Sequence, residues 1–479
     1  MKKIITLSIL ALIYGEVNAS GFILDVQSAD SMSTATANKA EAAEPSTIYY
    51  NPAGLAHLDG LQISSSLFII DMHIKYYNAQ AKYFSTHVSV SGKQGGKISG
   101  TTPVPQFFLS YQINDTATFG LGIYAPFGAE TKYSDDSVLR YNITQAKLQS
   151  IAFNPTFAFR ITPNHSIGLG LIAEYTKAKL KQFADFSPAM NKGIPILGNY
   201  FNLVQNGAGD GYAKIKGDDW SLGYSLGWLW DINDSLRIGL SYRSKIAHTL
   251  KGKAEWHLDG SAFSCPILGE KFYNGIRNAG YVVEEEGKVG ITLPEIISIH
   301  GAWKVTPQIN LFGDASYGRH SRFTNLTIQW KESKTIADAV NVGKKTTGNQ
   351  TNFNPNFRSG WKFSLGGTYQ ITEPLQLRYG ISYDKSTVTN PEYRISAMPD
   401  NDRYGLGLGT KYKINDKTYL SISYTYFKVK NASAHVNGWC GGNTESGSSA
   451  KSCVSSRSSG NADFKSYANI LGVQLTKKF

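Results

Sequence analysis

The chain has 479 residues, only three of them cysteine, and its formal net charge is +12. So few cysteines exclude a disulfide-rich scaffold. No run of five or more basic residues accompanies the charge, which therefore indicates a surface facing anionic lipid headgroups and not a nucleic-acid partner. The abundance of aromatic residues and glycine (28 Tyr, 23 Phe, 8 Trp and 47 Gly, against 16 Pro) is typical of membrane β-barrels, which have interfacial girdles and tight turns.

The N-terminus has the pattern of a secretory signal peptide. Lys2 and Lys3 precede an apolar run from Ile4 to Ile13, and small residues follow up to Ala19. The run is about half of the roughly 20 residues that a membrane-spanning helix needs. We therefore expect residues 1–19 to be removed and the mature chain to begin near Ser20. No later apolar run is long enough for a spanning helix, which leaves a soluble protein or a barrel.

Residues 20–60 lack the alternation of a strand and are rich in Ala, Ser, Thr and Glu. Such a segment either hangs as a disordered periplasmic tail or folds into a barrel lumen as a plug. The apolar residues from Ile48 to Leu55 surround a rigid Asn51-Pro52 turn and favour the plug.

From residue 61 to residue 479 the chain alternates as strands between lipid and lumen do. Between Trp220 and Trp230 every second side chain is large and apolar, and Ser or Gly lies between most of them. In a soluble β-sandwich this face would be an aggregation hazard. Six short turns are expected at Asn114-Asp115, Pro163-Asn164, Asn233-Asp234, Thr306-Pro307, Glu373-Pro374 and Asn415-Asp416.

Seven longer polar stretches lie between these turns, at about 85–100, 134–140, 187–211, 259–286, 331–350, 390–399 and 437–461. Six turns and seven loops join fourteen strands, an even number with both ends on the periplasmic side. The sequence therefore predicts an all-β protein: a 14-stranded antiparallel transmembrane β-barrel in the bacterial outer membrane. We expect a monomer surrounded by outer-membrane lipids and lipopolysaccharide. The terminal Phe479 resembles the signal read by the barrel assembly machinery.

The cysteines and acidic residues suggest little further chemistry. Cys440 and Cys453 lie 13 positions apart in a loop rich in Gly and Ser, and in an oxidising compartment they are a candidate disulfide. Cys265 is then left over. The acidic run from Glu284 to Glu286 is better explained as a solvated patch than as a metal site, and the histidines lack ligand spacing. We expect no metal and no cofactor.

The motif G-x-S-x-G at residues 223–227 matches the nucleophile elbow of hydrolases. That elbow requires a sharp strand-to-helix turn, whereas Ser225 is expected in the middle of a strand. We therefore expect no enzyme, with an outer-membrane serine lipase as the enzyme-class rival. Two functions without catalysis also compete: a general aqueous porin that lacks a plug, and an adhesin whose function resides in its loops.

Several ordered motifs resemble one family. A mature start at Ser20-Gly21-Phe22 followed by Tyr50-Asn51-Pro52-Ala53-Gly54 resembles the N-terminal hatch of the long-chain fatty acid transporter (FadL) family of outer-membrane proteins. The segments 220–224, 240–244, 293–295 and 398–403 resemble the same family. The resemblance covers essentially the whole mature chain.

The resemblance implies a route for passive diffusion of a hydrophobic cargo. The cargo would pass from an extracellular groove to a lumenal pocket partly formed by the hatch, and leave sideways through a kink in the third strand. That strand, about Thr116 to Tyr133, holds the only interior Pro-x-Gly break of the expected strands, and proline cannot donate to a ladder. The resemblance thus indicates hatch and kink residues as substrate-binding or gating candidates: Phe22, Asn51, Pro52, Ala53, Pro126, Phe127 and Gly128.

One departure from the family concerns the cargo. The fatty-acid transporter carries a basic residue near the end of the fifth strand that can meet a carboxylate. Gln182 occupies the matching place here, followed by Phe183, and both are further candidates. Lys181 precedes it but points to the opposite face of the strand. Long-chain fatty acids remain the expected cargo, and a neutral hydrocarbon, as in the aromatic-uptake branch of the family, is the alternative.

Overall fold

The computed structural model describes residues 23–83, 87–187, 190, 207–323, 326–337, 345–353, 355–436, 438–439, 453–454 and 458–479. Phe22 and Cys440 lie outside the described residues, and of Cys453 only the backbone is described. The candidate disulfide therefore lies outside as well. Within the described ranges, no helix combines the length and the apolar character needed to cross a membrane.

The strands form one antiparallel sheet that closes on itself, because the last long strand pairs with the first as well as with its predecessor. The strands are β1 (Leu61–Gln80), β2 (Gly96–Lys97), β3 (Thr101–Gln112), β4 (Ala117–Tyr124), β5 (Gly128–Lys132), β6 (Gln145–Thr162), β7 (His165–Asp185), β8 (Asp210–Asn233), β9 (Leu236–Arg243), β10 (Ile246–His257), β11 (Glu284–Leu293), β12 (Ile296–Lys304), β13 (Ile309–Gly318), β14 (Leu326–Ala337), β15 (Lys345–Phe353), β16 (Gly360–Gln370), β17 (Leu375–Asp384), β18 (Arg403–Asn415), β19 (Thr418–Val436), β20 (Gly438–Trp439), β21 (Cys453–Val454) and β22 (Gly460–Lys478).

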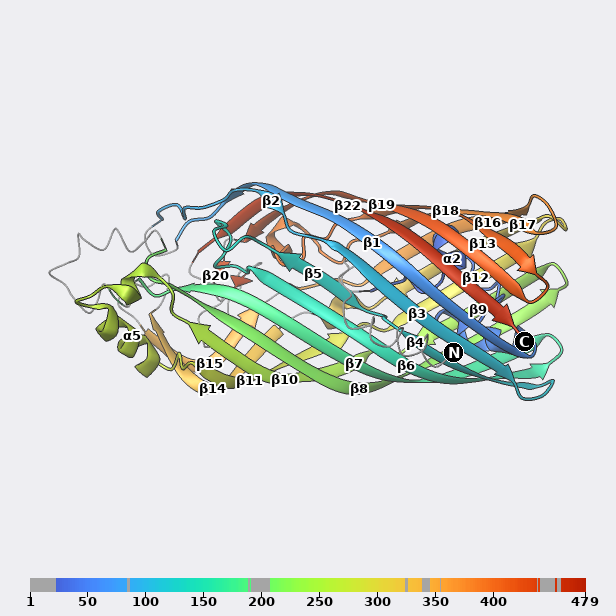
Figure 1. Cartoon of the computed structure of the whole chain (residues 1–479), viewed down its shortest axis with the longest axis horizontal. Helices are drawn as coiled ribbons and strands as arrows, with labels where there is room; N and C mark the ends of the chain where they lie inside the picture. Colours follow the sequence, from blue (N-terminus) through green and yellow to red (C-terminus); the bar gives the residue numbers. More distant parts are fainter. Residues whose placement is uncertain are drawn as a thin grey trace.

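The closed wall has fourteen antiparallel strands, which confirms the predicted fold class. All six expected short turns join neighbouring wall strands at one end, which is the right-hand end of Figure 1. The longer connections lie at the other end, together with η4 (Ser261–Ser264) and α5 (Gly269–Asn278).

Several of the wall strands are interrupted. The third consists of β4 and β5, as the Pro-x-Gly break predicts. Four more wall strands are broken where the sequence pattern predicted no interruption: β9/β10, β11/β12, β13/β14 and β15/β16. These four breaks lie beside one another: on one side of them Arg243 pairs with Ile296, Ile296 with Gly318 and Gly318 with Gly360, and on the other side Ile246 pairs with Leu293. Pro294, which has no N–H group to donate, lies in one of them.

The outer face of the wall carries an apolar band between two aromatic rows. Leu169 and Leu226 face each other across β7 and β8 and are exposed. Trp220 marks one edge of the band on β8 and Trp230 the other. Ten residues at about 3.3 Å each, tilted by about 40°, correspond to a height of about 25 Å, which matches the apolar belt of outer-membrane barrels.

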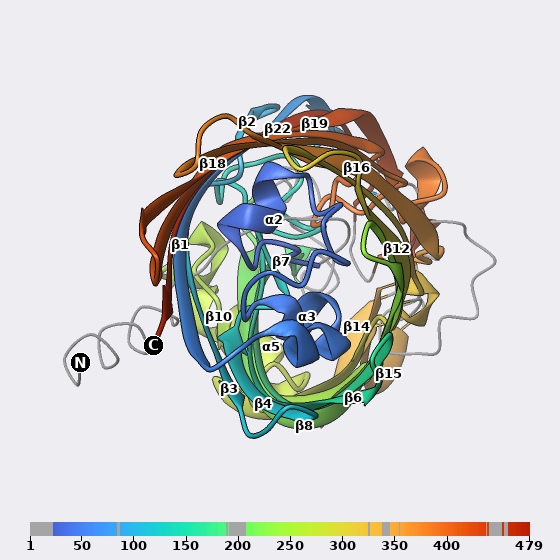
Figure 2. The same cartoon turned by 90° about the vertical axis from the view of Figure 1, so that its right-hand side faces the viewer.

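The N-terminal segment, residues 23–60, lies inside the ring of strands (Figure 2). It contains α2 (Ala29–Ser33), α3 (Thr47–Tyr50) and η1 (Pro52–His57), and almost all of its residues up to Leu55 are buried. The wall has glycine where this segment approaches most closely. A Cβ added to Gly380 would lie 2.2 Å from the Thr34 carbonyl, and one added to Gly227 would lie 2.1 Å from Oδ1 of Asn51. Any larger residue would displace the segment.

Ion pairs and hydrogen bonds also attach this segment to the wall. Lys411 contacts Asp30 at 2.7 Å, and the buried Arg378 donates to Oε1 of Glu41 at 3.1 Å. Burial alone would raise the pKa of Asp30, but Lys411 and Arg378 outweigh it and hold this pKa well below its usual range. The pKa of Glu41, which burial would also raise, is likewise lowered by Arg378. Both carboxyl groups therefore stay ionised and keep the segment bound to the wall.

The lipid-facing band is testable by charge insertion. Leu226→Arg places a cation near the bilayer midplane and is expected to destabilise the folded barrel by about 2–4 kcal/mol. Ile267→Arg is the matched control, because Ile267 is 88% exposed in the long connection after β10. Denaturant unfolding in lipid vesicles measures both variants. Equal stability of the two would contradict the assignment of the band.

Candidate binding cavity and wall opening

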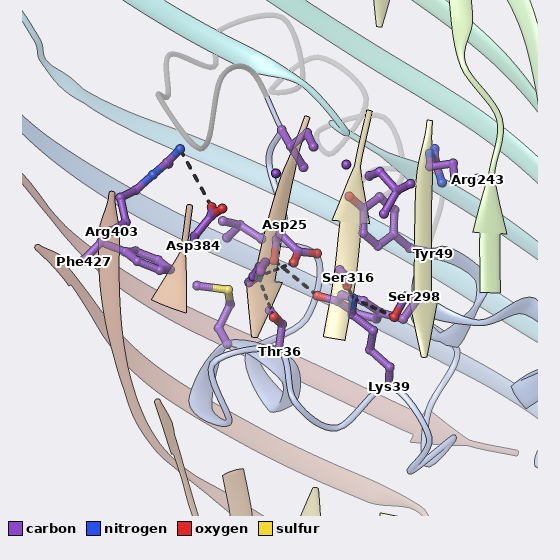
Figure 3. A pocket seen from close by; sticks show the side chains of 18 of the residues that line it. Asp25, Thr36, Lys39, Tyr49, Arg243, Ser298, Ser316, Asp384, Arg403 and Phe427 are labelled. Carbon is purple, nitrogen blue, oxygen red and sulfur yellow. Dashed lines mark hydrogen bonds and ion pairs between the residues drawn. The ribbon is translucent and has the colours of Figure 1, made fainter. Parts of the chain in front are cut away.

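A cavity lies between the N-terminal segment and the inner face of the wall (Figure 3). It encloses about 1280 Å³ of empty space, counted with the solvent open to it. One part of its lining is apolar and is formed by Val26, Met32, Ile70, Phe427, Val429 and Ile470. The cavity can therefore hold a hydrocarbon chain, and its polar groups decide what else binds.

Five basic side chains line this cavity, and four of them have a carboxylate partner. The four ion pairs are Lys39–Asp314 at 3.1 Å, Lys362–Asp25 at 2.6 Å, Lys385–Asp402 at 3.0 Å and Arg403–Asp400 at 3.2 Å. Burial would raise the pKa of Asp25, but Lys362 and Lys39 lower it overall, so Asp25 stays ionised and neutralises Lys362. These four cations are thus not available to a ligand.

Arg243, at the end of β9, is the fifth basic side chain and differs from the others. It is buried, and no carboxylate of the described residues lies within ion-pair distance of it. Its Nη2 donates to the Tyr124 hydroxyl at 2.7 Å, and its guanidinium lies 4.8 Å from the ring centre of Tyr49. Nε and Nη1 have no hydrogen-bond partner in the described part of the chain. A buried cation with unused N–H groups is costly unless a ligand pairs with it.

Ser225 stands directly opposite Arg243 in the pairing of β8 with β9. Its hydroxyl is buried and also lacks a partner among the described residues. Both residues line the same cavity, so three polar atoms without partners share one corner of it. Strand continues on both sides of Ser225, so the strand-to-helix turn of a hydrolase nucleophile is not present there.

The kink in the third strand comprises residues 125–127, between β4 and β5. Its backbone groups are satisfied by side chains, by the N-terminal segment and, at the carbonyl of Phe127, by the N–H of Ser150 at 3.1 Å. The bonds are Ala125 N–H to Gln106 Oε1 at 3.0 Å, Gln27 Nε2 to Ala125 O at 3.0 Å, Leu24 N–H to Pro126 O at 2.8 Å and Phe127 N–H to Ser150 Oγ at 3.0 Å. Two of these four bonds come from Leu24 and Gln27, so hydrogen bonds join the N-terminal segment directly to the kink.

The second wall strand also contributes to the opening. β3 pairs with β4 only from Phe107 onward, and within the described residues β5 pairs with β6 alone. The facing edge of β3 carries Pro103 and Pro105. Residues with odd numbers in β3 point their backbone groups toward the third strand, as the bond from Ile113 N–H to Ala117 O shows. Both prolines therefore remove N–H donors from the edge that borders the kink.

Pro103 and Pro105 are not among the residues predicted from the sequence, although the sequence contains a usable signal for them. Two prolines at a spacing of two residues lie on the same edge of a strand, and prolines within sheets occur at edges that need no donor. The residues from Thr101 to Gln106 pair with β1 on their other side. On the side of the third strand, within the described residues, this stretch has no ladder partner; we call this interruption of the ladder between residues 101–106 and β5 the wall opening.

The structure separates the predicted site residues into three groups. Pro52 lines the cavity, whereas the adjacent Asn51 does not; Nδ2 of Asn51 donates to Trp228 O of the wall at 3.1 Å. Ala53 is buried against Leu229 of the wall. Pro126, Phe127 and Gly128 lie at the kink, as given above. The third group, at the end of β7, lies apart from this cavity.

Gln182 and Phe183 form that third group. Nε2 of Gln182 donates to Tyr141 O at 2.9 Å, and the Phe183 ring lies 5.2 Å from that of Tyr212. Neither lines the cavity. The place that resembles the family's carboxylate contact is therefore remote from Arg243, the unpaired cation that the residue pattern could not single out.

A second cavity of about 1000 Å³ lies toward the long connections, between β5, β6 and β11. Its lining is almost wholly apolar and includes Leu148, Leu250, Ile291, Phe323 and Ile395. The two cavities together provide apolar surface at two levels of the barrel.

A closed fourteen-stranded barrel with an apolar outer band defines a transmembrane β-barrel protein. Residues 10–479 match the family model described as outer membrane protein transport protein (OMPP1/FadL/TodX), and the chain belongs to this family. An outer-membrane protein of Neisseria meningitidis serogroup B is 40% identical over 100% of this chain and 99% of its own length. The long-chain fatty acid transport protein of Escherichia coli O6:H1 is 26% identical over 88% and 90%.

Among solved structures, a Pseudomonas aeruginosa FadL homologue superposes with a TM-score of 0.78. It is 20% identical and is matched over 96% of this chain and 99% of its own, so it shows the fold alone. The chain is therefore located in the outer membrane. It is a transporter of hydrophobic molecules and not an enzyme.

The unpaired cation has an effect on stability that can be measured. Arg243→Met removes a buried charge that has no acidic partner among the described residues, and the ligand-free barrel is expected to gain about 1–4 kcal/mol. Arg403→Met leaves Asp400 without its cation and is expected to cost about 3–5 kcal/mol. Denaturant titration in detergent free of fatty acid tests whether the two substitutions change the free energy of unfolding in opposite directions. A loss of stability in both would show that Arg243 has a partner in the empty protein.

Proposed function

We propose that the chain carries long-chain fatty acids across the outer membrane by passive diffusion, and that Arg243 with Ser225 receives the carboxylate. The observation that supports this proposal is the group of three polar atoms, without partners in the described residues, at one corner of an otherwise apolar cavity. A carboxylate accepts charge-assisted hydrogen bonds from a guanidinium and satisfies these donors. A neutral hydrocarbon leaves them unpaired.

The rest of the cavity suits the acyl chain. Figure 3 places Phe427 and Arg243 at opposite sides of the cavity. Met32 and Ile70 add further apolar lining between the N-terminal segment and the wall. Each buried CH₂ contributes about 0.8 kcal/mol, so a long chain binds through its tail while the polar corner selects its head.

The exit that we propose is the wall opening between β3 and β5, gated by Pro126, Phe127 and Gly128. Sideways release into the bilayer keeps the hydrophobic gain of the acyl chain, whereas release into the periplasm would forfeit nearly all of it. The bonds from Leu24 and Gln27 to the kink connect cargo and gate. A ligand that displaces the N-terminal residues from the cavity would free the kink.

The N-terminal segment acts in this proposal as a hatch, residues 20–60, that follows a cleaved signal peptide, residues 1–19, and precedes the barrel, residues 61–479. Phe22, which precedes the described residues, remains a proposed substrate-binding residue of this hatch. The buried position of the segment and its ion pairs with the wall support a closed lumen. We further expect a monomer whose exposed Phe479 is read by the barrel assembly machinery.

A neutral aromatic hydrocarbon is the second candidate cargo. The second cavity favours it, because that lining presents almost no polar surface. In this case Arg243 would have a structural role beside Tyr49 and Tyr124, whose rings it contacts. The two candidates differ in whether Arg243 is needed for binding.

Removal of the Arg243 charge separates the two cargoes. Arg243→Met is expected to weaken oleate binding by roughly 10- to 100-fold, because a charge-assisted hydrogen bond contributes about 1.5–3 kcal/mol. Toluene binding should not change. Lys385→Met is the matched control, because Lys385 lines the same cavity but is paired with Asp402. Calorimetry with both ligands decides the matter, and unchanged oleate affinity in Arg243→Met would refute the carboxylate site.

The hatch can be tested by conductance. Deletion of residues 20–59 is expected to leave a folded barrel that passes small ions in planar bilayers. Arg378→Met should increase conductance to a smaller extent, because it breaks the buried contact with Glu41. Lys413→Met serves as the control, since Lys413 pairs with Glu373 at a short turn and not with the segment. If the deletion variant conducts ions no better than the intact protein, the segment does not act as a plug.

Both borders of the wall opening must change to close it. Pro126→Val with Gly128→Thr restores ladder-forming residues in the third strand only. Adding Pro103→Val and Pro105→Thr restores donors on the edge of β3. The fourfold variant is expected to bind oleate normally but deliver it to vesicles at a small fraction of the wild-type rate, and the twofold variant should lie between. Wild-type delivery by the fourfold variant would place the exit elsewhere.

A further inference from the structure

Lysines on neighbouring strands face one another across the outer wall. In the pairing register, Lys147 of β6 stands opposite Lys179 of β7, and Lys179 stands opposite Lys216 of β8. Lys216 in turn stands opposite Lys253 of β10. Side chains directly opposite in a sheet have Cβ atoms about 4.5–5.5 Å apart, and like charges in such pairs destabilise it. An uninterrupted row of four cations therefore needs anions from some source.

Within the described ranges, the protein supplies these anions only at the two ends of the row. Lys147 pairs with Glu130 at 3.0 Å and Lys253 with Glu284 at 2.6 Å. Lys179 and Lys216 in the middle, and Lys177 one step below them, have no carboxylate within ion-pair distance in the described parts of the chain. Lys179 and Lys216 thus have only lysines opposite them on this patch of the wall, and Lys177 has Asp218 opposite it in the pairing of β7 with β8, beyond ion-pair distance.

The same lysines border a hollow on the outer surface. It contains about 1550 Å³ of space open to solvent, and it lies between residues 97–100 and the strands β5 to β8. Its charged lining consists of Lys97, Lys132, Lys147, Lys177, Lys179 and Lys216, with Glu130 as the single acidic residue among the described ones. The hollow is therefore strongly cationic. It lies at the end of the wall opening, where the N–H of Lys132 donates to the carbonyl of Ile98 at 2.9 Å and joins the two borders.

The height of the row in the membrane follows from the aromatic residues beneath it. Tyr175 stands opposite Trp220, with ring centres 5.3 Å apart, and marks the upper edge of the apolar band. Lys177 and Lys179 follow Tyr175 by two and four residues on the same outward face. At about 3.3 Å per residue they lie roughly 5–10 Å beyond the hydrocarbon, at the level of lipid headgroups. The long connections lie at this end, which is the extracellular one.

We propose that Lys177, Lys179 and Lys216 form a binding site for the phosphate groups of the anionic glycolipid of the outer leaflet, lipopolysaccharide. Its phosphates supply the charge that the middle of the row lacks. Its acyl chains pack below on the outward Phe153, Leu171 and Tyr175. A bound glycolipid stands beside the wall opening, and it does so whichever hydrophobic cargo the channel carries.

The proposal predicts that removal of these lysines changes the stability of the barrel in opposite directions in two environments. In neutral detergent, the variant Lys177→Gln/Lys179→Gln/Lys216→Gln loses mutual repulsion and should unfold at a higher denaturant concentration than wild type. In vesicles containing bisphosphorylated lipid A it should unfold at a lower concentration than wild type. Its affinity for that lipid should fall about 100-fold, as three headgroup contacts imply. Native mass spectrometry of the full barrel measures the binding.

The control variant Lys304→Gln/Lys413→Gln/Lys417→Gln removes the same charge at the short-turn end and should behave as wild type toward lipid A. Dephosphorylated lipid A and inorganic pyrophosphate test the two halves of the ligand, and both should bind far more weakly than lipid A. Equal binding of lipid A by the two triple variants would overturn the proposal. So would equal binding of dephosphorylated lipid A or of pyrophosphate, since the site would then not recognise the phosphates of a lipid.

Discussion

A backbone N–H or C=O group that faces hydrocarbon has no water to bond with, and so the protein itself must satisfy it. The closure of β22 onto β1 meets this requirement around the wall. At the kink of the third strand the same requirement is met by substitutes: Gln27, Gln106 and Ser150 supply side-chain atoms, and Leu24 supplies an N–H. On the opposite border, Pro103 and Pro105 have no N–H group that needs a partner. On both borders of the wall opening, backbone groups that would otherwise face hydrocarbon without a partner are thus either hydrogen-bonded or, at the prolines, absent.

Inside the lumen, buried carboxylates are likewise provided with partners, here cations of the wall. The buried carboxylates of Asp25, Asp30 and Glu41 each meet a cation of the wall, which keeps their pKa values below the usual range despite burial. Glu44 is the exception. Burial, reinforced by Asp30, raises its pKa, and it accepts a hydrogen bond from the hydroxyl of Ser28 at 2.8 Å. Against this background of paired charges, Arg243 is conspicuous because it lacks an acidic partner among the described residues.

The outer surface, which faces lipid, also carries charges that the described part of the protein does not neutralise. Row by row, the strands place leucines and aromatics in the apolar band and lysines above it, and the middle lysines have no anion from the described part of the chain. Lumen and outer wall therefore each hold cations without an anionic partner among the described residues. The partners that we propose for them are the carboxylate of a cargo in the lumen and the phosphates of the surrounding membrane on the outer wall.

The sequence by itself determined the strands, their number and the six short turns, because a period of two residues and turn-forming pairs are local properties. It also located the kink, since Pro126 is unable to donate whatever surrounds it. Only the tertiary structure decided which charges are paired. Lys39 and Arg243 look alike in the sequence, yet one meets Asp314 and the other meets no carboxylate of the described residues. Pairing depends on register between strands far apart in the chain, and one sequence read alone does not contain that register.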